Sequence, residues 1–112
     1  MPHETPLSPL SMAILVSLGR DDRHGYALMQ EIEERSGGRL TPGTGSLYAA
    51  LQRLMDDGLI VESPDRPRAD EDRRRRYYRI TPEGRRAAAD EAQRMRELLS
   101  EARAAGLIPA DG

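Results

Sequence analysis

The chain has 112 residues and no cysteine, which allows one modest domain and excludes disulfides and thiolate metal sites. No apolar run approaches the roughly 20 residues of a membrane span, and the N-terminus lacks the regions of a signal peptide, so we expect a cytoplasmic protein without a membrane partner. The formal net charge of −2, taken as one number, argues mildly against a nucleic-acid partner. The distribution of charge argues otherwise, because residues 39–86 carry 11 arginines against 8 acidic residues while both ends of the chain are acidic.

A first helix is predicted after a loose N-terminal arm. Ser8 is a candidate N-cap, Pro9 suits the first helical position, and Gly19 is the expected end. Residues 20–23 are expected to form a polar turn. Met12 and Val16 are apolar but lie off the stripe that faces the core. We therefore expect a second subunit to cover them.

A second helix is predicted to open at His24-Gly25-Tyr26 and to break at Ser36-Gly37-Gly38. A single His beside a Gly, with no second ligand at metal spacing, is better explained as a capping or turn residue than as a metal ligand. We expect no metal and no cofactor.

The third helix is the centre of the prediction. Its apolar residues follow the spacing of one buried face, and Gly58 supplies a left-handed stop. The other face is small or hydrogen-bonding and fits a DNA major groove, with the alternative that this is an ordinary core helix. The candidate DNA-contacting residues are Thr44, Ser46, Tyr48, Ala49, Gln52 and Arg53.

A β-hairpin is predicted next, because residues 59–63 and 76–80 are branched or alternating. Tyr78 and Ile80 are expected on its covered face, and residues 64–75 form a long, charged tip.

Four consecutive arginines stand on the return arm of this hairpin and are expected to contact phosphates beside a groove-bound helix. They are Arg73, Arg74, Arg75 and Arg76. The alternative is a solvated charge run neutralised by the acidic residues Asp70, Glu71 and Asp72.

A last helix begins at Thr81-Pro82-Glu83, which combines a capping hydroxyl, a first-turn proline and an acidic residue, and extends to about Ala105. A narrow seam with spacings of four, three, four and three runs along it. The seam residues are Ala88, Ala92, Met95, Leu99 and Ala102. We expect them to pack on a second copy of the chain together with Met12 and Val16; the alternative is that the helix folds back on its own domain.

The predicted fold is therefore mainly α with a small β-hairpin. Residues 1–80 form a winged helix-turn-helix DNA-binding domain, residues 81–106 a dimerisation helix and residues 107–112 a flexible tail.

Taken together, these residues resemble the PadR family of winged-helix transcriptional regulators over roughly residues 7–86. The matching segments are Leu7-Ser8-Pro9-Leu10, His24-Gly25-Tyr26, Gly45-Ser46-Leu47-Tyr48 with Leu51 and Arg53-Leu54, Asp57-Gly58-Leu59-Ile60, and Arg76 to Pro82 with Gly84-Arg85. The resemblance implies a dimeric regulator, usually a repressor, of the short type with one C-terminal dimerisation helix. Some relatives bind aromatic or drug-like effectors; this chain has neither Trp nor Phe, so a small-molecule effector remains unknown.

The predicted function is a sequence-specific DNA-binding regulator, a repressor that binds an inverted-repeat operator as a homodimer. The alternative is a winged-helix module whose arginine-rich hairpin binds an acidic protein. An enzyme is not expected, because there is no phosphate-cradling glycine loop and no nucleophile with a base beside it.

Overall fold

The structure, a computed structural model, describes residues 7–63 and 76–109, which form four helices and three short strands. In chain order they are α1 (Pro9–Arg20), β1 (Arg23–His24), α2 (Gly25–Arg35), α3 (Thr44–Asp56), β2 (Ile60–Glu62), β3 (Tyr77–Ile80) and α4 (Pro82–Ala104). The mainly α prediction is confirmed. The predicted hairpin tip, residues 64–75, lies outside the described residues.

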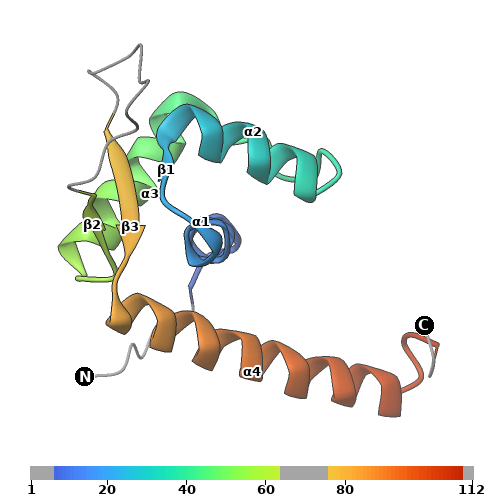
Figure 1. The fold of residues 1–112 in the computed structure, drawn as a ribbon. Coiled ribbons are helices and arrows are strands. Elements are labelled where there is room, and N and C mark those ends of the chain that lie inside the picture. Colours follow the sequence, from blue (N-terminus) through green and yellow to red (C-terminus); the bar gives the residue numbers. More distant parts are fainter. Residues whose placement is uncertain (1–6, 64–75, 110–112) are drawn as a thin grey trace.

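Helix α1 lies at the centre of the molecule, with α2 and α3 on one side and α4 on the other (Figure 1). Aliphatic side chains from the first three helices meet the strands in one core. The fully buried members of this core include Ile14, Leu15, Leu18, Leu28, Leu47, Leu51, Leu54, Leu59 and Ile60. The predicted core face of the third helix is confirmed, although Met55 is only partly buried.

Three of the four helices begin with a side chain that accepts a hydrogen bond from a backbone N–H of the first turn, as the sequence predicted. The Ser8 hydroxyl accepts from the Ser11 N–H at 3.1 Å, and the Thr81 hydroxyl accepts from the Gly84 N–H at 2.9 Å. The third is His24, whose Nδ1 accepts from the Ala27 N–H at 3.1 Å. The capping role expected for His24 is therefore confirmed.

The sheet has three antiparallel strands in the order β1-β3-β2, so the predicted hairpin is present and a further strand lies beside it. Tyr78 and Ile80 are buried, as predicted. Residues 20–23 were expected to form only a polar turn, but Arg23 pairs with Tyr78 at the start of β1. Two residues are too few to show alternation, so this strand depends on a partner far along the chain.

Two helix ends differ in how well the sequence located them. Gly58, with φ of +77°, provides the left-handed stop after α3. Gly19 does not end α1, which continues through Arg20.

At the other end of the chain, Gly106 has φ of +77° and the Leu107 N–H donates to the Ala102 carbonyl at 3.0 Å. Leu107, the first residue of the predicted tail, therefore takes part in the C-terminal cap of α4.

Helix α4 joins the body only at its beginning. Gly84 is its one buried residue among those described, and a Cβ there would collide with the Leu59 carbonyl and lie 2.8 Å from Cγ1 of Ile80. The rest of this 23-residue helix extends away from the core (Figure 1). The Cα radius of gyration is consequently 15.7 Å, against about 13 Å for a compact chain of this length.

Candidate nucleic-acid interface

The outer face of α3 is open to solvent along its whole length, while its inner face is buried. The exposed set matches the candidate DNA-contacting residues of this helix, namely Thr44, Ser46, Tyr48, Ala49, Gln52 and Arg53. The same helix thus supplies core packing on one side and a small, polar surface on the other. The core-helix alternative describes only the first of these two sides.

The N-terminal end of α3 is built for close approach by an anion. Its N-cap is Gly43, and no described side chain caps it, in contrast to the other three helices. The N–H groups of the first turn have no intrahelical partner, as in any helix, and here no described side chain caps them. Gly45 and Ser46 add little bulk there, and the turn contains no acidic residue. This geometry suits a phosphate oxygen.

Tyr48 has a second contact, which sequence reasoning missed. Its ring packs over Gly25, the first residue of α2, where a Cβ would lie 2.7 Å from Tyr48 Cζ and closer still to the hydroxyl oxygen. Tyr48 is nevertheless 44% exposed, so it joins α2 to α3 while keeping its edge in solvent. Burial, together with the nearby Tyr48 hydroxyl, raises the pKa of Tyr78 beneath it.

Gln52 and Arg53 complete the outer face. The Gln52 amide donates to Asp56 Oδ1 at 3.0 Å on the exposed surface, a bond it must exchange to reach a base edge. Arg53 lies beside it, fully outward. Both side chains are long enough to extend from the helix toward a ligand that lies against it.

The hairpin beside α3 brings one of the four predicted arginines into the described structure. Arg76 is exposed and its Nε lies 3.4 Å from Glu62 Oε2 on the neighbouring strand. Arg73, Arg74 and Arg75 lie outside the described residues. The prediction that this run contacts phosphates therefore stays a prediction.

A carboxylate between α1 and β1 bonds to both arms of the hairpin. Asp22 Oδ2 accepts from the Ser63 hydroxyl at 2.7 Å and from Arg79 Nη2 at 2.9 Å. Burial raises the pKa of Asp22, but the hydrogen bonds from Arg79 and Ser63 and the charges of Arg79 and Arg23 outweigh it, so the pKa lies below its ordinary value. Sequence reasoning assigned Asp22 only to a polar turn, since its partners lie 41 and 57 residues away.

The residues predicted to meet a second subunit fall into two groups. Met12 is only 9% exposed within a single protomer, in which α4 packs against α1. Ala88 and Ala102 are partly buried. By contrast, Val16 and the outer seam residues are open, with exposed fractions of 46% for Val16, 47% for Met95 and 43% for Leu99. Ala92 is exposed as well.

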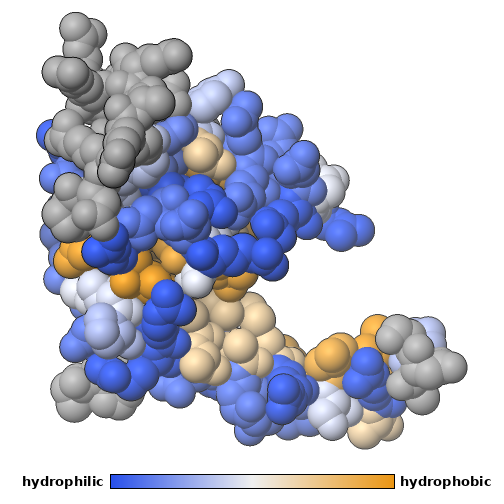
Figure 2. All heavy atoms as spheres, viewed as in Figure 1, coloured by the Kyte–Doolittle hydropathy of each residue, from blue (hydrophilic) through white to orange (hydrophobic). Residues whose placement is uncertain are grey.

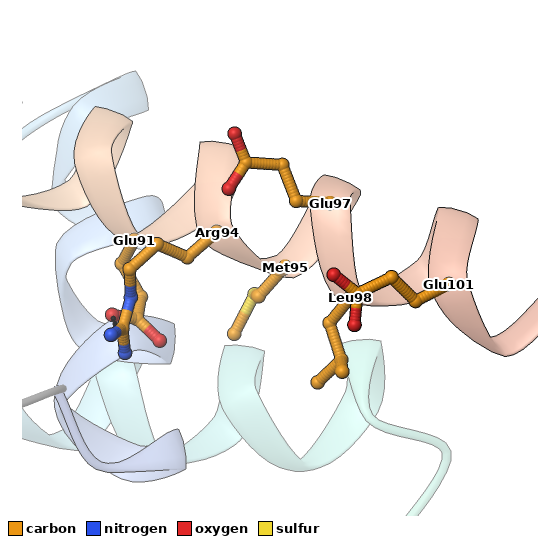
Figure 3. Close-up of a pocket in the computed structure, with 6 residues that line it drawn as sticks. All are labelled: Glu91, Arg94, Met95, Glu97, Leu98 and Glu101. Carbon is orange, nitrogen blue, oxygen red and sulfur yellow. Dashed lines mark hydrogen bonds and ion pairs between the residues drawn. The ribbon is translucent and has the colours of Figure 1, made fainter.

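The apolar surface of α4 is broader than the predicted seam. Leu98 is 66% exposed and was missed, although it lies three residues from Met95 on the same side of the helix. Figure 3 shows Met95 and Leu98 pointing toward the same side of α4. They line a pocket of about 340 Å³ together with Glu91, Arg94, Glu97 and Glu101. Figure 2 shows the outer half of α4 standing apart from the body with apolar side chains toward the open space.

Within residues 7–63 and 76–109, no cluster of three or more His or acidic side chains could hold a metal ion. No described helix has the length and apolar character that crossing a membrane requires.

Comparison with known proteins agrees with this architecture. The family model for the transcriptional regulator PadR-like family matches residues 14–90. The chain is 41% identical over 99 residues to transcriptional regulator Rv3488 of Mycobacterium tuberculosis, covering 88% of this chain and 87% of that protein.

Solved structures show the same fold. A PadR family transcription regulator from Clostridium difficile superposes with a TM-score of 0.75 at 24% identity, covering 86% of this chain and 96% of that one. A transcriptional regulator from Clostridium thermocellum gives 0.69 at 29% identity, with 82% and 84% covered. The chain belongs to the PadR-like family of transcriptional regulators.

Proposed function

We propose that this regulator binds double-stranded DNA in a sequence-specific manner as a homodimer and represses transcription by occupying a promoter. Each protomer places the outer face of α3 in a major groove, and the hairpin meets the adjacent backbone. The observation that carries this proposal is the outer surface of α3, where Thr44, Ser46, Ala49, Gln52 and Arg53 are exposed beside the partly exposed Tyr48 and the first turn carries no acidic residue.

The chemistry of that surface supports separate roles for its residues. Ser46 and the uncapped N–H groups of the first turn suit phosphate oxygens, and Tyr48 positions the helix through its hydroxyl. Ala49 and Gln52 lie nearest the base edges, where a small side chain permits close approach and an amide reads adenine or another paired base. Arg53 and the arginine run from Arg73 supply attraction that depends on salt.

The exposed apolar stripe of α4 supports the dimer. A monomer of this size would leave Met95, Leu98 and Leu99 in water, together with Leu107 and Ile108 beyond the helix end. Packing two such helices against each other removes these side chains from solvent. The two reading helices then stand at a fixed separation, which predicts an inverted-repeat operator with half-sites about one helical turn, roughly 34 Å, apart.

A mobility-shift titration tests the proposal. The wild-type protein is mixed with labelled DNA from upstream of its own gene and, in parallel, with the same DNA carrying one scrambled half-site. We expect a shift that survives an excess of unlabelled nonspecific DNA and weakens by at least tenfold when a half-site is scrambled. If the unlabelled nonspecific DNA abolished the shift, the protein would not bind DNA in a sequence-specific manner.

The same experiment addresses the protein-binding alternative. A stable dimer that gives no shift at low salt on any DNA would leave the arginine-rich hairpin without a nucleic-acid role, and an acidic protein would then be the better partner. Repression itself is tested with a reporter under the shifted promoter, whose expression should rise when the regulator is deleted.

A further inference from the structure

The hairpin is joined to the helix-turn-helix by a very short piece of sheet. Only two residue pairs connect β1 to β3, Arg23 with Tyr78 and His24 with Tyr77. An edge-on contact between the His24 and Tyr77 rings, at 5.2 Å between centroids, adds to them. Ile60, Tyr78 and Ile80 seat the covered face of the hairpin in the core, while backbone pairing between β3 and the body is limited to these two residue pairs.

One carboxylate bridges this junction from the body side. Asp22 follows the last residues of α1 and directly precedes β1, and it receives the Ser63 hydroxyl at the end of β2. It also receives Arg79 from β3, with Nε at 3.2 and 3.3 Å from the two oxygens and Nη2 at 2.9 Å from Oδ2. Both arms of the hairpin are thus tied to one side chain that belongs to neither.

The partners of Asp22 are well placed to hold orientation. Ser63 is only 6% exposed, and its own N–H donates to the Tyr77 carbonyl at 2.7 Å, so its hydroxyl is fixed by the ladder. The Arg79 guanidinium is planar and approaches both carboxylate oxygens, which restricts direction as well as distance. Asp22 is itself held, because its N–H donates to Asp21 Oδ1 at 2.8 Å and its carbonyl accepts from Arg23 Nη1 at 3.0 Å.

The segment that carries Asp22 is tied in turn to the helix-turn-helix. Arg23 Nε lies 3.2 Å from Glu31 Oε2 in α2, and His24 caps the same helix. A continuous series of hydrogen bonds and ion pairs therefore links α2, through Arg23 and Asp22, to Ser63 and Arg79 on the two arms of the hairpin.

We propose that Asp22 is a positioning residue that sets the hairpin against the helix-turn-helix, and so fixes where the hairpin meets DNA beside α3. The DNA part of this inference rests on the proposed function, while the hold on the hairpin does not. Asp22 touches no nucleic acid; it acts through Ser63 and Arg79.

The test compares Asp22→Asn with Asp21→Asn, a matched change one residue earlier at a side chain that is 77% exposed and bonds to no described residue of either hairpin arm. The asparagine keeps an Oδ1 that can still accept from the Asp22 N–H, so this control leaves that bond in place. Hydrogen exchange of the free proteins is measured first. We expect the Ser63 and Tyr78 amides to exchange about tenfold faster in Asp22→Asn, because an amide cannot replace the charged fork, while α3 and Asp21→Asn stay at wild-type rates.

Two further variants separate positioning from general stability. Ser63→Ala removes the hydroxyl that donates to Asp22 but leaves Arg79 in place, so it is a milder variant to use if Asp22→Asn does not fold. It should give a smaller rise in the exchange rate of the same amides. Arg79→Lys keeps the charge but loses the fork, so it should resemble Asp22→Asn if orientation matters, and wild type if charge alone does.

DNA titration and hydroxyl-radical footprinting follow on the same proteins. We expect Asp22→Asn to lose the protection flanking each half-site while keeping the protection under α3, with affinity about tenfold lower. The inference would be overturned if the Ser63 and Tyr78 amides of Asp22→Asn exchanged at wild-type rates. It would also be overturned if they exchanged faster while the DNA footprint stayed the same as that of wild type. Failure of the wild type to bind any DNA would instead end the proposed function, and the exchange data would still decide whether Asp22 holds the hairpin.

Discussion

Helices α3 and α4 expose surfaces of opposite character. The exposed side of α3 is small and polar, whereas α4 is exposed almost all round and carries an apolar stripe through Met95, Leu98 and Leu99. A polar surface without acidic bulk suits a charged, hydrated partner such as DNA, and an exposed aliphatic stripe suits another protein surface. The exposed surface of α3 is therefore suited to contact DNA, and that of α4 is suited to contact a second protomer.

The largest effect is expected from a charge placed in the α4 stripe. Met95→Asp buries a carboxylate in the proposed dimer contact, so we expect a monomer by sedimentation and a DNA affinity at least a hundredfold lower, because the two heads are no longer linked. Gln93→Asp adds the same charge on the opposite side of the helix and should stay dimeric. A Met95→Asp protein that sediments as a dimer would show that the stripe was wrongly chosen.

Adjacent alanines on α3 separate its two faces. Ala50 is 3% exposed, and Ala50→Leu should lower the free energy of unfolding by about 1–3 kcal/mol through overpacking. Ala49 is exposed, so Ala49→Leu should leave urea unfolding unchanged while lowering operator affinity tenfold or more by steric clash in the groove. Unchanged affinity in Ala49→Leu would mean that this face does not approach base pairs.

Replacing Arg73, Arg74, Arg75 and Arg76 with Ala should weaken binding to specific and nonspecific DNA alike. The slope of log affinity against log salt should fall by up to about 3 to 4, since each phosphate contact contributes close to 0.9. Titrations at several salt concentrations measure this. If both affinity and slope match wild type, the hairpin contributes no phosphate contact.

The smallest effect concerns pH. The pKa of Asp22 lies below its ordinary value in the folded chain, so its stabilisation is present above the unfolded pKa of about 3.9 and is lost as pH falls through the lower, folded value. The free energy of unfolding of wild type should exceed that of Asp22→Asn by about 1 kcal/mol in urea at pH 7, and the two should converge once the pH falls below the folded pKa of Asp22. A difference that is constant with pH would rule out the ionised carboxylate as its source.

Local chemistry accounts for the parts of the fold that sequence reasoning located well. The Ser8 and Thr81 caps, the Gly58 stop and the buried stripe of α3 each depend on residues within one or two helical turns. The open side of α3 follows from the same periodicity, so the candidate reading surface was also predictable.

Contacts between distant residues decided the rest. Strand β1 exists because Arg23 and His24 meet β3, and Asp22 found its partners only when the hairpin folded beside α1. Met12 is buried within its own protomer, whereas Leu98 is exposed on the part of α4 that extends beyond the body (Figure 1).

The sequence by itself determined which segments become helices and strands and which face of each is apolar, since propensity, capping and periodicity act over a few residues. Only the tertiary structure decided which apolar and charged groups are already satisfied within one protomer. That outcome depends on how α1, the hairpin and α4 pack in space, and no local pattern records it.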